Sequence, residues 1–177
     1  MKEKWEQDAS NPKEYHVVEA KRGREFILRL TTGADVYLAI QQFALDHDIR
    51  FAKIHAAFMG GLKPTKFLMW APDTSNPSNW HNESTATIGN QSMILSMSGV
   101  IHPRIMKGKE EPFPAIHFVT GGAWDVPTMG GHLEQGTIVK GVLEIFITEI
   151  LGIDVLLPSD YDPKSDVAPE SWYKKIE

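Results

Sequence analysis

A single stretch of this chain has the apolar spacing of an amphipathic helix. Apolar residues recur there at the i, i+3, i+4 and i+7 positions that share one helical face, namely Val36, Ala39, Ile40 and Phe43. The spacing predicts a helix from about Ala34 to His47. Thr32 stands three residues before Asp35, which predicts a capping-box-like start. Outside this stretch the core has to come from elements of another kind.

The other apolar segments are short and are separated by turn signals, which is typical of strands. They include "FAKIHAAFMGGL", "KFLMWA", "SMILSMSGVIH", "AIHFV" and "HLEQGTIVKGVLEIFITEI". Short connections favour antiparallel pairing. The predicted class is therefore α+β, a mostly antiparallel sheet of about seven strands flanked by one main helix. No Gly-x-Gly-x-x-Gly or P-loop motif occurs, which argues against a doubly wound nucleotide-binding fold.

The segment "KRGRE", from Lys21 to Glu25, is predicted to be the turn of a hairpin, with Gly23 supplying the turn. Its Arg-Gly-Arg core is also typical of arms that bind the minor groove of DNA. Here no proline follows and an acidic residue ends the run. We therefore favour the hairpin turn.

Length and composition indicate one globular domain. The chain has 177 residues, of which 42% are hydrophobic and 23% charged. We place the domain at residues 15–157, between a polar N-terminal arm at 1–14 and a C-terminal extension at 158–177. The extension is poor in aliphatic residues.

Charge and cysteine usage exclude several kinds of function. The net charge is −5 and no Lys/Arg-rich run occurs, so nucleic-acid binding is not favoured. With no cysteine, a metal site must use other ligands, such as His, Asp or Glu. The charged N-terminus does not resemble a secretory signal, and no segment is long and apolar enough to cross a membrane. A cytoplasmic protein is expected.

Two histidines enclose the glycine-rich segment "HFVTGGAWDVPTMGGH". If the chain folds back symmetrically, His117 and His132 lie opposite each other on paired strands. Residues so opposed have Cβ atoms about 4.5–5.5 Å apart, close enough for two imidazoles to share a metal. Gly130 and Gly131 lack Cβ and would permit positive φ or a close approach to the backbone. The alternative is an ordinary hairpin with no ligand.

Two further polar residues are weaker candidates for the same site. His102 could face it from a neighbouring strand. Glu144 alternates with Leu143 and Ile145, and an inward carboxylate there is costly unless it is paired or ligating. Glu144 could equally face solvent or a subunit interface.

Several motifs, taken in order, resemble the plant-and-prokaryote conserved (PPC) domain. They are "REFILRLTTGADVYLAIQQFA", "IHAAFMGGL", "MILSMSGVI" and "GGHLEQG". The resemblance covers roughly Tyr15 to Leu156. It implies an antiparallel sheet with a main helix and shorter helical segments, a homotrimer, and a site that holds a metal, usually zinc, on a His-x-His pair and the histidine of Gly-Gly-His. Bacterial members are also labelled as predicted DNA-binding proteins.

The chain departs from this family pattern at two site positions. Only His117 remains of His-x-His; Val119 or Ala115 replaces the other histidine, depending on the alignment. Met93 stands where the family has glutamate. His102 could substitute as a ligand. The apolar changes also suit an organic-ligand pocket lined by Met93, Val119 and Trp124.

Three functions are therefore open at this stage. The first, which we favour, is a trimeric module that binds a small molecule or a metal, zinc or another divalent ion, at His117, His132 and His102. The second is a DNA-binding regulator. The third is a metal-assisted enzyme of unknown substrate, with Glu144 or His102 carrying the proton.

Overall fold

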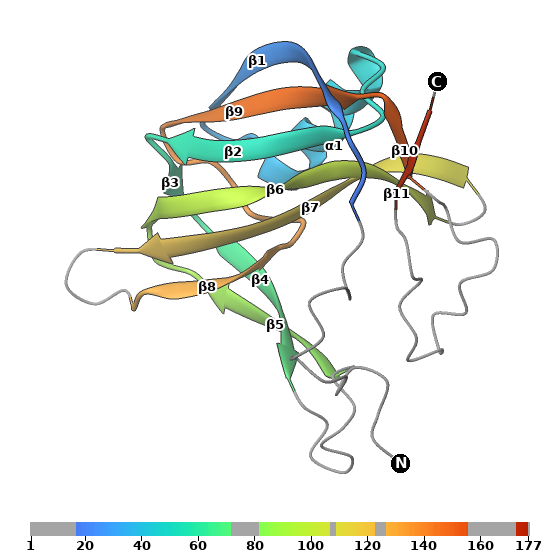
Figure 1. Cartoon of the computed structure of the whole chain (residues 1–177). Helices are drawn as coiled ribbons and strands as arrows, with labels where there is room; N and C mark the ends of the chain where they lie inside the picture. The colour runs from blue at the N-terminus through green and yellow to red at the C-terminus, as the bar shows by residue number, and fades with distance from the viewer. Residues whose placement is uncertain (1–16, 72–81, 107–108, 123–126, 156–172, 177) are drawn as a thin grey trace, which may run out of the picture.

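A computed structural model describes residues 17–71, 82–106, 109–122, 127–155 and 173–176. Within these residues the chain forms one helix, α1 (Val36–Asp46), and eleven strands (Figure 1). The strands are β1 (Lys21–Thr31), β2 (Ala52–Phe58), β3 (Gly61–Leu62), β4 (Thr65–Ala71), β5 (Asn82–Ile88), β6 (Ser92–Met106), β7 (Lys109–Gly121), β8 (Met129–Leu133), β9 (Val142–Leu151), β10 (Ile153–Val155) and β11 (Tyr173–Lys175).

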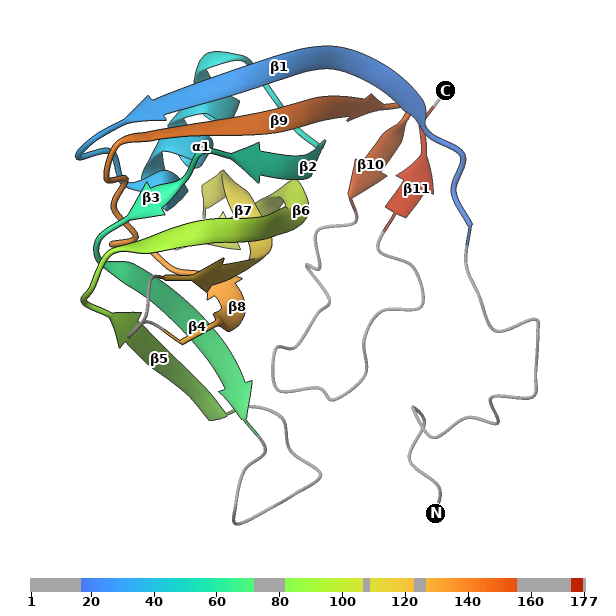
Figure 2. The same cartoon turned by 90° about the vertical axis from the view of Figure 1, so that its left-hand side faces the viewer.

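Nine of the strands form one antiparallel sheet. Its order is β1-β9-β2-β6-β7-β8-β4-β5, with β3 paired to β6, and β10 pairs with β11 separately. Figure 2 shows how the sheet curves from β1 and β9 round to β4 and β5. The antiparallel α+β class is confirmed, but the count of seven strands was too low. The two-residue β3 and the glycine-containing β8 have no strand-like apolar run. The predicted shorter helical segments are absent from the described ranges, where α1 stands alone.

Helix α1 forms where the apolar spacing predicted it, two residues shorter at the start and one at the end. Its N-cap is Asp35, whose carboxylate accepts the N–H of Leu38 at 3.2 Å. The predicted capping role of Thr32 was wrong, because the Thr32 hydroxyl bonds instead to the backbone of Gly141. The buried face of α1 consists of Val36, Ile40, Phe43 and Ala44.

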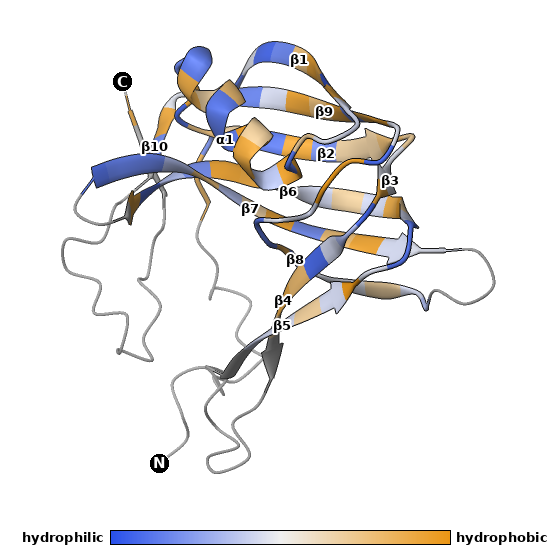
Figure 3. Ribbon diagram, turned by 180° about the vertical axis from the view of Figure 1, so that it is seen from behind, coloured by the Kyte–Doolittle hydropathy of each residue, from blue (hydrophilic) through white to orange (hydrophobic). Residues whose placement is uncertain are grey.

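The helix covers one face of the sheet, as seen from behind in Figure 3. Side chains alternate between this inner face and the opposite outer face along each strand. On β7, Ile116 and Phe118 are buried while His117 and Val119 are exposed. The inner side chains form one large core cluster that includes residues of α1 and of the central strands. The helix in the described part of the chain is far too short to span a membrane.

The predicted hairpin around Gly23 was wrong. Residues 21–31 form one strand, and a β-bulge lies between Arg22 and Glu25 in its pairing with β9. A Cβ on Gly23 would lie 2.9 Å from the carboxylate of Glu149. Gly23 therefore makes room for this carboxylate, which accepts hydrogen bonds from the Arg24 guanidinium at 2.7 and 2.8 Å.

This ion pair predicts a pH dependence of stability. Hydrogen bonding from Arg24 lowers the pKa of the Glu149 carboxyl, against the opposing effect of burial. A lowered folded-state pKa adds stability above the unfolded pKa, and the contribution is lost as the pH falls through the folded value. We expect wild type to exceed Glu149→Gln in urea-unfolding free energy at pH 7, and the gap to close below about pH 4. A gap that stays constant between pH 7 and pH 3 would contradict the assignment.

Candidate functional site

Strands β7 and β8 bring the two histidines together. In the antiparallel register His117 lies directly opposite His132, and their ring centroids are 5.3 Å apart at an interplanar angle of 80°. The predicted cross-strand pairing is thus confirmed. Both side chains point away from the inner face, because the adjacent Phe118 and Leu133 are buried in the core.

The glycines before His132 allow three strands to pack closely. Gly131 lies opposite Phe118, and a Cβ there would come within 3.2 Å of the Leu68 carbonyl oxygen and of Phe67 on β4. A Cβ on Gly130 would come within 3.1 Å of the Phe118 carbonyl oxygen. Neither glycine has positive φ. The pair is explained by this close approach of β8 to its neighbours.

An aromatic and cationic cluster adjoins the histidine pair. The Phe113 ring stacks on His132, with centroids 5.9 Å apart at 19°, and meets His102 edge-on at 5.3 Å. The Arg104 guanidinium lies over the same Phe113 ring, 4.7 Å from its centroid. We call His117, His132, His102, Arg104 and Phe113 the histidine cluster.

Burial and the neighbouring cationic groups favour the neutral form of His132. Burial, followed by repulsion from His117, Arg104 and His102, lowers the pKa of His132 to about 4. A neutral imidazole presents a lone pair at neutral pH, which is the form that binds metals. The site therefore offers a ligand nitrogen without prior deprotonation.

His102 is not brought to the pair as a third ligand. Its ring contacts Phe113, and its Nδ1–H donates to its neighbour's carbonyl, that of Pro103, at 2.8 Å. Burial lowers the pKa of His102 as well. Among the described residues no group of three or more His, Cys, Asp or Glu side chains is placed to hold a metal.

The donor set fits half of a tetrahedral metal site. A metal bonded at about 2.0–2.1 Å to one nitrogen of each ring separates the two centroids by roughly 5 Å at a tetrahedral angle. The observed 5.3 Å between His117 and His132 matches this value. Zinc sites use three or four protein ligands. The remaining positions would have to be filled by water, a small ligand or another subunit.

The predicted apolar lining is only partly adjacent to the pair. Val119 lies two residues from His117 on the same face and opposite Gly130. Met93 lies on β6 opposite Gly121, with 56% of its surface exposed. Trp124 lies outside the described residues.

Glu144 is not brought to the histidines. It lies on β9, which β2 and β6 separate from β7. Its carboxylate pairs with Arg29 on β1 at 2.6 Å. This ion pair on the outer face accounts for the polar residue in the apolar strand.

Sequence reasoning missed Phe113 and Arg104. Phe113 and His117 are four residues apart on β7 and therefore share a face of the strand. Arg104 and His102, two residues apart on the paired strand β6, share a face in the same way. The "HPR" and "PFPAIH" segments could have indicated both, had the register of the long β6–β7 hairpin been known. Tyr37 on α1 also reaches Phe113, with ring centroids 6.3 Å apart.

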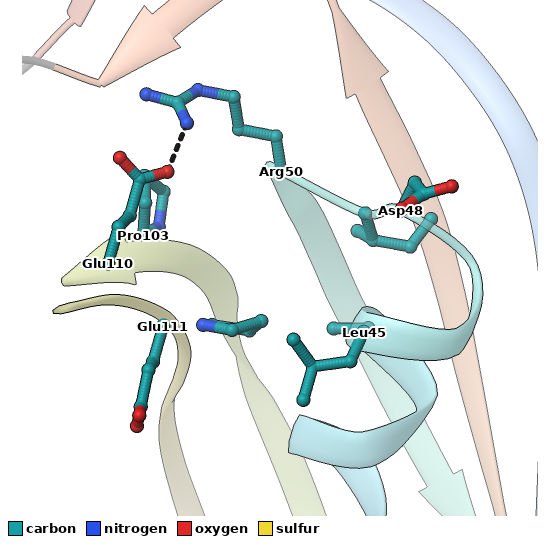
Figure 4. A pocket seen from close by; sticks show the side chains of 9 residues that line it. Leu45, Asp48, Arg50, Pro103, Glu110 and Glu111 are labelled. Atoms are coloured by element: carbon teal, nitrogen blue, oxygen red, sulfur yellow. Dashed lines mark hydrogen bonds and ion pairs between the residues drawn. The ribbon is translucent and has the colours of Figure 1, made fainter.

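A pocket lies away from the histidine pair, between the end of α1 and the β6–β7 hairpin (Figure 4). Its volume is about 260 Å³, and its lining combines Leu45 with acidic residues such as Asp48 and Glu111. Arg50 crosses it and pairs with Glu110 and Asp154. None of the predicted site residues lines this pocket.

Together these features define a domain with a curved antiparallel sheet, one covering helix and a histidine pair across two adjacent strands. The chain belongs to the Plants and Prokaryotes Conserved (PCC) domain family, which it matches over residues 17–151. The family resemblance in the sequence is thereby confirmed.

Solved structures support the same fold. A plant- and prokaryote-conserved (PPC) protein from Pyrococcus horikoshii has 23% identity and a TM-score of 0.64, covering 80% of this chain and 88% of that one. The metal-containing protein from Archaeoglobus fulgidus has 24% identity and a TM-score of 0.61, covering 77% and 86%. A candidate DNA-binding protein from Ralstonia eutropha has 20% identity and a TM-score of 0.57, covering 76% and 84%. The comparison with curated proteins found no match.

Proposed function

We propose that this chain is a homotrimeric binding module whose site is the His117–His132 pair. The pair holds a divalent metal, with zinc the first candidate, and leaves coordination positions open for a small ligand. The observation on which this rests is the cross-strand geometry, with a centroid separation of 5.3 Å. Burial, which lowers the pKa of His132, favours the metal-binding form of the imidazole. The metal content of the Archaeoglobus fulgidus protein of similar fold is consistent with it.

Zinc titration tests the metal. We expect chelator-free wild type to bind about one zinc per chain. Since His132→Ala removes a ligand itself, its affinity should fall by more than the tenfold to hundredfold typical of losing an outer-shell partner. Elemental analysis measures the zinc content and calorimetry measures the zinc affinity. His55→Ala is the matched control, because His55 on β2 bonds to Thr148 at 2.6 Å instead. Equal zinc binding by wild type and His132→Ala would refute the site.

The outer face of the sheet supports the proposed trimer. No helix covers this face in the described part of the chain (Figure 1). Large apolar side chains on it are exposed. Exposed apolar residues in such number on one face are typical of subunit contacts. They are Ile27, Phe58, Met93, Leu95, Val119 and Phe146.

A charge on this face should break the assembly. Leu95 is 62% exposed, so Leu95→Glu should leave the fold intact while placing an unpaired carboxylate in the subunit contact. We expect wild type to sediment as a trimer and Leu95→Glu as a monomer. Leu45→Glu is the control, because Leu45 is 51% exposed on α1, away from this face. A monomeric wild type, or a trimer in both variants, would contradict the proposal.

DNA binding is the second candidate. Its support is the similarity in fold to the candidate DNA-binding protein from Ralstonia eutropha. The net charge of −5 opposes it, because non-specific DNA binding depends on Lys and Arg contacts to phosphates. A gel shift at low salt with random duplexes distinguishes the two candidates. A metal-assisted enzyme would require a substrate that none of these observations names.

A further inference from the structure

Arg104 holds a positive charge that no carboxylate neutralises at close range. The register places Arg104 opposite Glu111, yet its guanidinium lies over the Phe113 ring. Within the described residues Arg104 forms no ion pair. A cation held on an aromatic face retains its hydrogen-bond donors for another partner.

Aromatic and histidine rings lie beside Arg104 on the side of the histidine pair. Phe113 contacts Arg104, His102 and His132, and His132 contacts His117. Among the described residues no carboxylate forms an ion pair with any of these side chains. Arg104 is therefore a locally unpaired cation on a chain whose net charge is negative.

We propose that the histidine cluster binds a small oxyanion, with Arg104 as its anchoring residue. Guanidinium groups match carboxylates and tetrahedral oxyanions through paired N–H donors. The imidazoles of His117 and His132 add polar partners that carry no negative charge. An apolar part of the ligand would lie against Val119, which shares the face of His117. This inference rests on the proposed function for the location of the site, and names the class of ligand there.

Benzoate and sulfate are suitable probes, because they separate carboxylate from tetrahedral anion and bind free zinc weakly. Benzamide serves as the uncharged analogue of benzoate. Each is titrated into ¹⁵N-labelled full-length protein at constant ionic strength, before and after zinc loading. Amide shifts near Arg104, Phe113 and His132 report the binding. We expect benzoate, sulfate or both to bind, and benzamide to bind at least about tenfold more weakly.

Variants of Arg104 test the anchor. Arg104→Gln should weaken anion binding about tenfold or more, and Arg104→Lys should retain part of it. Arg22→Gln is the control, because Arg22 pairs with Glu25 on the edge strand β1. Thermal unfolding confirms that each variant is folded. Anion binding that survives Arg104→Gln, or equal binding of benzoate and benzamide, overturns the inference.

The zinc proposal and the oxyanion proposal can be refuted independently of each other. If zinc binds and neither anion does, the metal site stands and the oxyanion inference is overturned. If both anions or one of them bind in an Arg104-dependent manner and zinc does not bind, the oxyanion inference stands and the metal is excluded. A shift that both anions cause equally in the wild type and in all variants identifies a general salt effect, which also overturns the inference.

Discussion

Gly99→Ala is expected to lower the free energy of unfolding by about 3 kcal/mol or more, because overpacking between rigid backbone atoms cannot relax by a side-chain movement. Gly99 lies in the middle of β6, paired with Ile54 on β2 and with Ile116 on β7. A Cβ at this position would stand 2.3 Å from the Ala115 carbonyl oxygen and 2.7 Å from the Ile116 Cα. The strands would have to separate at the centre of the sheet. Urea unfolding followed by circular dichroism measures the loss.

Gly89→Ala is the matched control. A Cβ on Gly89 meets nothing within 4 Å, and its φ is not positive. Its replacement should change the unfolding free energy by less than about 0.5 kcal/mol, as is usual for surface positions. Equal effects at Gly89 and Gly99 would show that the close approach between β6 and β7 is not as tight as described.

Phe118→Ala is expected to cost about 3–5 kcal/mol, the range for removing a buried phenylalanine. The Phe118 ring is 2% exposed and stacks on the fully buried Phe67, with centroids 4.6 Å apart at 21°. Phe118 also lies between His117 and Val119 and faces Gly131 across the β7–β8 pair. The cavity left by the ring would therefore form directly beneath the histidine pair.

Phe118→Leu separates the loss of volume from the loss of apolar contact. Because leucine fills much of the space, we expect it to cost less than half as much as alanine. Calorimetric unfolding gives the two values. The same variants can be titrated with zinc. A Phe118→Ala protein as stable as wild type would show that this part of the sheet is not packed as described.

The class of the fold could be predicted because it depends on local patterns. The helix was predictable from four apolar residues on one face, three of which, Val36, Ile40 and Phe43, are buried against the sheet. The central strands of the sheet were predictable from their apolar runs and from the alternation of apolar and polar residues. Such patterns need no knowledge of distant residues.

The errors arose where distant residues decide the local structure. Gly23 resembles a turn residue until Glu149, 126 positions later in the chain, is seen to occupy the space beside it. Thr32 resembles a cap until Gly141 takes its hydroxyl. Both outcomes depend on pairing with β9 or the segment before it, which local sequence does not specify.

The site divides in the same way. His117 and His132 could be paired from the sequence because one hairpin contains both. Phe113 and Arg104 could not be placed, because the contact between them depends on the register of the β6–β7 hairpin, and the contact of Phe113 with His132 depends on the pairing with β8. The distance of Glu144 from the histidines could not be predicted, because the sequence does not specify the order of the strands in the sheet.

The position of β8 has a mechanical consequence. In the sheet order, the five-residue β8 joins β4 and β5 to β7 and the strands beyond it. A ligand held by His117 and His132 would act as a cross-link between β7 and β8, and its binding free energy would add to the free energy needed to separate β8, β4 and β5 from β7. Occupancy of the site would then be measurable on the neighbouring strand, as slower amide exchange along β4.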